Sequence, residues 1–522
     1  MKDSLYSWQE DCLREWFRQN GRGLVEAVTG SGKTRLALEA SRRLTKTDAA
    51  SHKDGSLLFK IVVPTAALQR QWSKALREFL APQEAADIGL WGGGHHSHRE
   101  KKYMIYVINS ARYTLARQIL EDLKRGDRVF LIADECHHYA SGENQRIFDF
   151  YPFLRQYEGQ YFSLGLSATL PQGEARTFLV RSLGHCIYRY GIRRALQNQT
   201  ICKYDIYHIQ IPFEPKERNQ YDDLTTKMTD LYKRLLRQRP ELSRKSLPDF
   251  YKELEHLASG KNPQLSKMAL QYMRLTYRRR TLVCLAKYRL ACALQLIRLL
   301  GVQEKILVFG ERICQAEELY QSLEREFPHR VGRYHSQMGD LANKNVLERF
   351  RNGDIRILIT CRSLDEGIDI PETAIGIILS GTSRQRQRIQ RLGRIIRKAQ
   401  GKECASLYYL HLDETSEDSV FLPDCGENPI FELTYLPERE EFYNPSYRLA
   451  AEAAWKELGG IQAGEKVQKE FFRCIEAGSV RDHWLRDPAW LKDQLNGTKN
   501  LRERNYWSCM KRLRSHKKPT KS

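Results

Sequence analysis

The chain has 522 residues, of which 41% are hydrophobic, so a mostly disordered protein is excluded and several packed cores are expected. Lysine and arginine number 85 against 64 aspartate and glutamate residues, and the resulting net charge of +21 favours a polyanionic partner. No apolar run reaches the ~18–20 residues that cross a bilayer, and the first residues hold no apolar signal core. Nucleic acid, and not a membrane, is therefore the expected polyanion.

Cysteine and histidine patterns give no sign of a metal centre. The 12 cysteines form no C-x-x-C pair and no spacing suited to zinc, so we expect reduced thiols and a cytoplasmic location. The segment GGGHHSH at 92–98 clusters His95, His96 and His98, but no group of acidic residues stands beside it. A solvated loop is favoured over a metal site there.

The segment AVTGSGKT at 27–34 resembles a phosphate-binding loop, with Ala27 where the strict pattern has glycine. A short apolar segment precedes it and an amphipathic helical pattern follows, so the loop would join a buried strand to a helix N-terminus. We expect Lys33 to reach the β- and γ-phosphates and the Thr34 hydroxyl to hold Mg²⁺. The residues expected to surround the phosphates are Thr29, Gly30, Ser31, Gly32, Lys33 and Thr34.

A pair of acidic residues follows the apolar run that opens the next informative segment, VFLIADECHH at 129–138. The continuous apolar run predicts a parallel strand buried on both faces, and ligands bind at the carboxyl ends of such strands. Asp134 would hold Mg²⁺ through water, and Glu135 would orient and deprotonate the attacking water. With the phosphate loop, these acids predict ATP hydrolysis.

The alternation of apolar strands and helices predicts an α/β fold. The expected strands of the first 200 residues are 24–27, 59–63, 105–108, 129–133 and 162–166. This order predicts a parallel sheet covered by helices on both faces, and residues 300–412 repeat the pattern. Residues 215–300 read as helices; their basic stretch 272–290 is either a nucleic-acid-facing prong, which we favour, or an ordinary basic helix.

Two weaker regions follow. Residues 413–445 are acidic and irregular, which suits a linker, and residues 446–522 read as a helical, basic accessory region. The final stretch could add salt-sensitive phosphate contacts or be frayed and idle, and the region could also bind protein partners.

A third candidate site lies in QRLGRIIR at 390–397. Gln390, Arg394 and Arg397 are spaced so that all three lie on one face of a helix. Two arginines that project together can stabilise charge on the γ-phosphate, the role of an arginine finger. The alternative is a solvated basic helix, but the position after GIDIP favours function.

These motifs, in this order, resemble those of superfamily 2 helicases of the DEAD/DEAH type. AVTGSGKT, DECH (134–137) and SAT (167–169) are similar to motifs I, II and III. Within the superfamily the chain looks most like the XPB-type branch and its restriction-like relatives, because of the DECH tetrad, the opening LYSWQEDCLREW and the helical insertion. The further matches are VVPTAALQRQW (62–72), INSAR (108–112), VFGERI (308–313), TCRSLDEGIDIP (360–371) and QRLGRIIR (390–397), the last of which is similar to motif VI.

The resemblance implies two tandem RecA-like lobes, 1–200 and 201–412, that bind ATP and Mg²⁺ between them. It implies that Gln9 reads adenine, although the usual basic neighbour is missing, and that Ser167 and Thr169 couple hydrolysis to strand binding. It also implies that Gln390 faces the nucleotide and that Gly367 and Asp369 couple the strand to the nucleotide. The implied contacts with one nucleic-acid strand are Thr65, Gly93, Ser110 and Thr360.

The expected activity is an ATP-dependent helicase or translocase, with DNA favoured over RNA. Two alternatives stay open: a duplex translocase motor of a defence or restriction assembly, and a nucleic-acid-sensing switch gated by ATP. Most contacts of such proteins go to the phosphate backbone, so little base specificity is expected.

Overall fold

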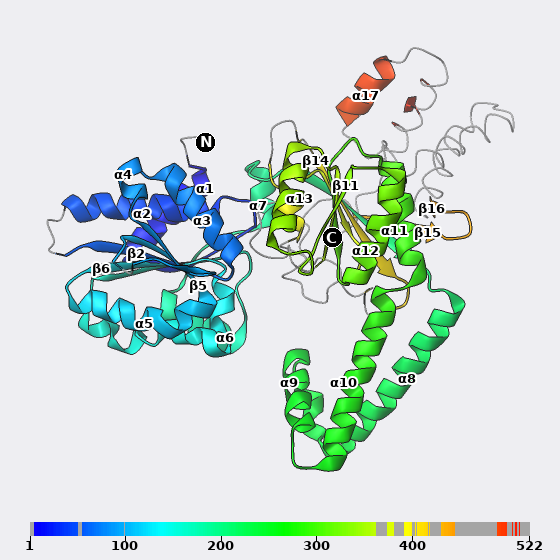
Figure 1. Ribbon diagram of the computed structural model, residues 1–522, viewed down its shortest axis with the longest axis horizontal. Coiled ribbons are helices and arrows are strands. Elements are labelled where there is room, and N and C mark those ends of the chain that lie inside the picture. The colour runs from blue at the N-terminus through cyan, green and yellow to red at the C-terminus, as the bar shows by residue number, and fades with distance from the viewer. Residues whose placement is uncertain are drawn as a thin grey trace.

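The computed structural model describes residues 5–50, 55–98, 100–361, 373–380, 391–398, 404–415, 430–443 and 488–497, together with residues 402, 417, 504, 507, 508 and 511. The chain forms two α/β lobes that lie side by side, and a helical arm projects from the second lobe (Figure 1). The predicted two-lobe fold is therefore confirmed.

The first lobe, lobe 1, is built on an eight-stranded sheet of order β4-β3-β5-β2-β6-β7-β1-β8. All neighbouring strands are parallel except β3 and β4. The middle strands are buried along their whole length, as their continuous apolar sequences require. The bounds are β1 (Arg22–Ala27), β2 (Leu57–Val63), β3 (Ile88–Gly92), β4 (His95–His96), β5 (Tyr103–Val107), β6 (Arg128–Ala133), β7 (Tyr161–Ser167) and β8 (Cys186–Tyr190).

Helices cover both faces of this sheet, with α1 to α4 on one face and α5 and α6 on the other (Figure 1). Two apolar clusters hold these layers together, one on each face, and the first of them continues into lobe 2 through residues such as Leu307 and Leu392. The helices are α1 (Ser7–Arg18), α2 (Lys33–Ala50), α3 (Ala66–Phe79), α4 (Pro82–Ala85), α5 (Ile108–Lys124), α6 (Gly173–Leu183) and α7 (Ile192–Gln197). Three short 3₁₀ helices are η1 (Cys136–Ala140), η2 (Gly142–Phe148) and η3 (Tyr151–Gln156).

The second lobe, lobe 2, has an eight-stranded sheet of order β11-β12-β10-β13-β14-β9-β15-β16. Its strands are β9 (Lys203–Ile211), β10 (Ile306–Gly310), β11 (Val331–Tyr334), β12 (Ile357–Cys361), β13 (Ile375–Ile378), β14 (Cys404–Leu412), β15 (Ile430–Leu436) and β16 (Glu441–Tyr443). Helices α11 (Lys287–Leu300), α12 (Ile313–Glu326) and α13 (Asp340–Asn352) belong to this lobe, and α17 (Pro488–Asn496) lies beyond it in the chain.

Part of the expected acidic linker is strand. β15 pairs in parallel with β9, and β16 pairs in antiparallel fashion with β15. The sequence FELTYL alternates apolar and polar residues, and Phe431, Leu433 and Tyr435 are buried against lobe 2. The acidic residues on either side of this short strand concealed the alternation in the sequence.

The predicted helical insertion is present and forms the arm of α8 (Pro215–Gln238), η4 (Pro240–Arg244), α9 (Leu247–Ala258) and α10 (Pro263–Cys284) (Figure 1). Small apolar clusters hold the arm helices together away from the two sheets. Helix α11, which we expected within the insertion, packs instead in the core of lobe 2 through residues such as Leu296 and Ile297.

Within the part of the chain that the structure describes, no helix is both long and apolar enough to traverse a bilayer, and no group of three or more metal-ligating side chains gathers. His95 and His96 form the short strand β4, where both side chains are exposed. The nine described cysteines carry free thiols.

Candidate nucleotide site between the two lobes

The phosphate loop joins the end of β1 to the first residue of α2. Gly30 and Gly32 have φ angles of +87° and +95°, a backbone region that other residues rarely enter. The loop is closed by two internal hydrogen bonds: Lys33 Nζ donates to the Ala27 carbonyl (2.9 Å), and Ser31 Oγ donates to the Val28 carbonyl (2.7 Å). The loop is therefore held in a closed conformation in which the amine of Lys33 is bonded to the end of β1.

Gln9, the predicted adenine reader, is buried against this loop from helix α1. Its Nε2 donates to the Gly32 carbonyl (2.9 Å), while its Oε1 accepts from the Tyr6 amide (2.9 Å). The amide group is therefore held in one orientation, with its two ends on the loop and on the start of α1.

The two acids follow β6, at the same edge of the sheet as the phosphate loop. Asp134 accepts hydrogen bonds from Trp72 Nε1 (2.8 Å) and from the Glu135 amide (3.0 Å). Burial raises the pKa of Asp134, while the Trp72 hydrogen bond and the nearby Lys33 charge oppose that rise. Glu135 adopts a left-handed backbone (φ 46°, ψ 48°), a conformation that non-glycine residues hold only under local constraint and that clusters at functional sites.

A chain of polar contacts runs from Glu135 to the predicted coupling residues. His137 Nδ1 lies 3.4 Å from Glu135 Oε2 and 2.9 Å from Ser167 Oγ. Ser167 Oγ in turn lies 3.2 Å from the Thr169 amide and accepts from it. Sequence reasoning assigned no role to His137, although its place two residues after Glu135 was a signal; the structure makes it the physical connection between the two segments.

Lobe 2 contributes residues 391–398 to the same site. The Cγ of Arg397 lies 2.9 Å from where a Cβ on Gly30 would stand, and a Cβ on Gly393 would overlap Thr29. Arg394 is half-buried on the same segment. The segment is anchored by a hydrogen bond from the Cys202 amide to the Ile396 carbonyl (2.9 Å). The structure thus brings Arg397 to the phosphate loop, whereas Gln390, Gly367 and Asp369 lie outside the described residues.

Three of the predicted strand contacts gather at the carboxyl ends of β2, β3 and β5. Thr65 caps α3, where its Oγ1 accepts from the Leu68 amide (3.2 Å). Gly93 is exposed with φ +63°, and a Cβ there would stand 2.8 Å from the Cβ of Ala66. Ser110 lies in the first turn of α5 and is half-buried. These three positions share one edge of lobe 1.

Thr360 differs from the other three. It lies in β12 of lobe 2, is buried, and its hydroxyl donates to the Val308 carbonyl (3.0 Å) inside the sheet. A contact with a nucleic-acid strand would need this hydroxyl to leave that bond, so its role stays a prediction.

The basic stretch 272–290 divides into structural and free arginines. Arg289 is fully buried, donates to the Leu410 carbonyl (2.7 Å) and pairs with Glu417 (2.6 Å), so it holds lobe 2 together. Arg274 and Arg278 are exposed on α10 and form no ion pair among the described residues. Only this part of the stretch matches the predicted prong.

Comparisons with known proteins agree with this geometry. Residues 2–172 match the family "Type III restriction enzyme, res subunit", and residues 287–399 match "Helicase conserved C-terminal domain". The chain is 27% identical over 400 residues to "DNA 3'-5' translocase XPB2" of Sulfurisphaera tokodaii, covering 76% of this chain and 79% of that protein. It is 24% identical over 398 residues to "Putative DNA 3'-5' helicase Rad25" of Haloarcula marismortui, covering 76% of this chain and 51% of that protein.

Solved structures share the fold. The type ISP restriction-modification enzyme LlaBIII bound to DNA aligns with a TM-score of 0.51 at 16% identity, covering 96% of this chain and 35% of that one. A Saccharomyces cerevisiae Dbp5 variant bound to RNA and ADP BeF3 aligns with a TM-score of 0.50 at 14% identity, covering 83% and 90%. At these identities the likeness shows the fold alone.

Two RecA-like lobes with a phosphate loop, a DECH box and a motif VI arginine between them define an ATP-hydrolysing superfamily 2 helicase, and this chain belongs to that class. Within the superfamily its matches are to the res subunit of type III restriction enzymes and to an XPB-type translocase.

Proposed function

We propose that this chain is an ATP-driven motor that acts on DNA and hydrolyses ATP in the cleft between its two lobes. The observation that carries the proposal is the approach of Arg397, from lobe 2, to Gly30 of the phosphate loop in lobe 1. Only residues 391–395 are helical, and Arg397 lies beyond them in a bridge with Ile201, so the expected single helix face is wrong for Arg397. A segment that was basic only for solubility would have no reason to place an arginine against the phosphate loop. DNA is favoured over RNA because the names of the XPB2 and Rad25 relatives describe a DNA translocase and a DNA helicase. We extend this substrate to the present chain as part of the proposal.

The side chains divide the work of hydrolysis. Lys33 leaves the Ala27 carbonyl to neutralise the β- and γ-phosphates. Gln9 positions the loop through its hydrogen bond to the Gly32 carbonyl. Glu135 accepts a proton from the attacking water, and Arg397 with Arg394 stabilises the negative charge that grows on the γ-phosphate. Because these arginines come from the other lobe, the bound triphosphate favours a closed cleft, and its hydrolysis relieves that preference.

The oxygen donors suit Mg²⁺. The Thr34 hydroxyl and the Asp134 carboxylate are hard ligands, and Mg²⁺ is commonly held by one or two protein oxygens together with phosphate oxygens and waters. When bound, the ion neutralises phosphate charge. The buried Trp72 hydrogen bond orients Asp134 for that contact.

The test is ATP hydrolysis measured against single-stranded DNA, duplex DNA and RNA, beside strand-separation and triplex-displacement assays. We expect DNA to stimulate hydrolysis more than RNA does. Strand separation would establish a helicase, and triplex displacement alone would establish a duplex translocase of the restriction type. Stimulated hydrolysis with no displacement of either kind would contradict the motor and favour an ATP-gated switch.

A further inference from the structure

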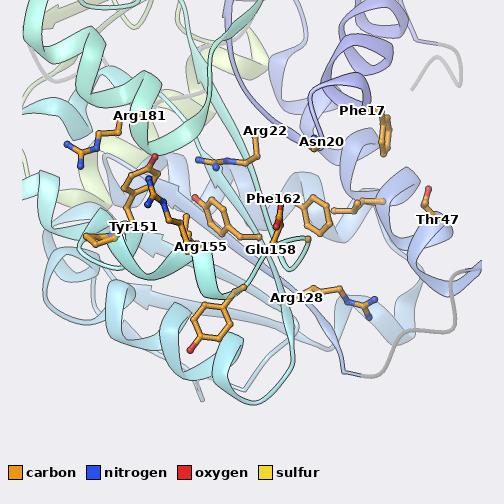
Figure 2. Close-up of a pocket in the computed structure, with 17 residues that line it drawn as sticks. Phe17, Asn20, Arg22, Thr47, Arg128, Tyr151, Arg155, Glu158, Phe162 and Arg181 are labelled. Atoms are coloured by element: carbon orange, nitrogen blue, oxygen red, sulfur yellow. The ribbon is translucent and has the colours of Figure 1, made fainter.

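Figure 2 shows a hollow in lobe 1. It lies at the edge of the sheet opposite to the nucleotide site. Its walls include the first residues of three parallel strands, namely Arg22 of β1, Arg128 of β6 and Tyr161 of β7. The nucleotide site uses the last residues of those strands, and a six-residue strand separates the two edges by about 20 Å. Because of this separation, the hollow is distinct from the nucleotide site. Its volume is about 1250 Å³.

The charge in this hollow is strongly one-sided. Four arginines line it against one acid, Glu158; they are Arg22, Arg128, Arg155 and Arg181. Arg128 is buried and donates to the Gly55 carbonyl (2.9 Å), so we assign it a structural part. The other three gather around Tyr151 on one side of the hollow (Figure 2).

Two guanidinium groups converge on the same ring. The Cζ atoms of Arg22 and Arg181 lie 6.0 Å and 5.6 Å from the ring centroid of Tyr151. Within the described residues, Arg22, Arg155 and Arg181 form no ion pair with any carboxylate. Arg22 donates to the Ser182 carbonyl (3.3 Å), but its buried Nε has no hydrogen-bond partner. Like charges held together without a counter-charge favour the binding of an anion.

The lining also identifies the kind of anion. Guanidinium groups bind phosphate through paired hydrogen bonds, and aromatic rings bind bases by stacking. Three half-buried rings also line the hollow, namely Phe17, Tyr157 and Phe162. Phe17 lies across the hollow from Arg181 (Figure 2). The volume exceeds the ~300–1,000 Å³ of ordinary small-molecule pockets, which favours an extended occupant over a single phosphate.

We propose that this hollow, lined by Arg22, Arg155, Arg181 and Tyr151, is a second nucleic-acid site that binds a single-stranded segment through its phosphates and bases. It goes beyond the proposed function, because the strand contacts expected for the motor lie at the opposite edge of lobe 1. A strand held here would keep the protein attached to its substrate while the cleft between the lobes opens and closes.

The test compares two double variants that remove the same charge. Arg155→Ala with Arg181→Ala alters the hollow at two exposed positions, and Arg176→Ala with Arg117→Ala alters arginines on α6 and α5 that do not line it. Binding of a fluorescent oligothymidylate is measured by anisotropy over a salt series without ATP. The hollow variant should bind several-fold more weakly at low salt, and its slope of log K against log[salt] should fall by about 0.7 for each lost phosphate contact.

The control variant should keep the wild-type affinity and slope, and both variants should bind a fluorescent ATP analogue with the wild-type Kd in the absence of nucleic acid. Ultraviolet cross-linking of an iodouracil strand should label residues 151–158 in the wild type. Equal affinity and slope in the two double variants would overturn the proposal. A second outcome would also overturn it. If Lys33→Ala protein binds a fluorescent ATP analogue, and this binding is lost when Arg155 and Arg181 are also replaced by alanine, the occupant of the hollow is a free nucleotide. None of these readouts requires hydrolysis, so they are independent of whether the motor assignment holds.

Discussion

Arg397 and Gly30 are 367 residues apart in sequence yet in contact across the two lobes: a Cβ added at Gly30 would stand 2.9 Å from the Cγ of Arg397. The phosphate loop and motif VI therefore share one surface, and changes on either side of it should act on the same step of the reaction.

Replacing Arg397 with alanine should leave ATP binding within a few-fold of wild type and lower kcat by roughly 10³-fold, because the guanidinium acts on transition-state charge. Gly30→Ala should also abolish hydrolysis, since its φ of +87° disfavours a side chain and the new methyl meets Arg397. The measurement is steady-state ATP hydrolysis beside nucleotide binding. Lys398→Ala, which changes the next residue, should stay near wild type; a similar loss there would argue that the segment matters only for packing.

Replacing Glu135 with glutamine should keep ATP bound and block its cleavage, because the amide cannot accept the proton of the attacking water. Lys33→Ala should also abolish hydrolysis but weaken nucleotide affinity, since the charge that faces the phosphates is lost. Single-turnover cleavage and nucleotide retention on a filter separate the two effects. Glu143→Gln on η2 is an exposed isosteric control. Normal hydrolysis by Glu135→Gln would show that another group is the base.

Ser167→Ala should uncouple the motor. The change breaks the 2.9 Å contact with His137, so basal hydrolysis should persist within about threefold while stimulation by nucleic acid and displacement are lost. Ser163→Ala is a matched control, because Ser163 lies in the same strand, is buried and donates to the Leu183 carbonyl (2.7 Å). If both variants lose stimulation equally, the effect belongs to the strand and not to the His137 contact.

Glu311→Gln should destabilise lobe 2. The buried carboxylate pairs with Arg280 at the base of the arm (2.8 Å) and lies 3.7 Å from the fully buried Arg391 of motif VI. Removing its charge leaves Arg391 poorly compensated, at a cost of about 3 kcal/mol. Faster hydrogen exchange in β10 and β12 would be the expected readout. Glu318→Gln, exposed on α12, should change nothing, and unaltered exchange in Glu311→Gln would refute the bridging role.

Lobe 2 should lose stability in mild acid through His208. Burial, with a smaller contribution from His411, lowers the pKa of His208 to about 3. Because the unfolded chain takes up this proton near pH 6.5 and the folded chain does not, stability is full above about pH 6.5 and falls by about 2 kcal/mol by pH 5. His208→Phe, which keeps a ring against Tyr409, should flatten this dependence in urea unfolding, whereas the exposed His256→Asn should not. Parallel pH curves for His208→Phe and wild type would contradict the assignment.

Much of the fold could be predicted because its signals are local. Each of the five strands expected in lobe 1 is present, since a strand buried on both faces must be apolar throughout. The alternating strand β15 was missed, because acidic residues beside it made the region read as a linker. Helix α11 was assigned to the insertion because its sequence does not show which apolar core receives it.

The candidate site divides in the same way. The positions of the phosphate loop with Lys33 and of the acids after β6 could be predicted from sequence, because a glycine-rich turn and an acidic pair after an apolar run are local patterns. His137 was not found, since its role depends on Ser167, a residue 30 positions away. The clustering of the four arginines in the opposite hollow could not be predicted either, because arginines scattered along a basic chain form no sequence pattern.

The sequence by itself determined the strands of lobe 1, the phosphate loop and the position of the acidic pair after β6, because these depend on backbone freedom and on apolar periodicity within a few neighbouring residues. Only the tertiary structure decided that Arg397 meets Gly30, that Glu311 lies between Arg280 and Arg391, and that Arg22 and Arg181 face one tyrosine. Those contacts join segments from about 30 to more than 360 residues apart, and the packing of whole lobes, which no local pattern encodes, sets their distances.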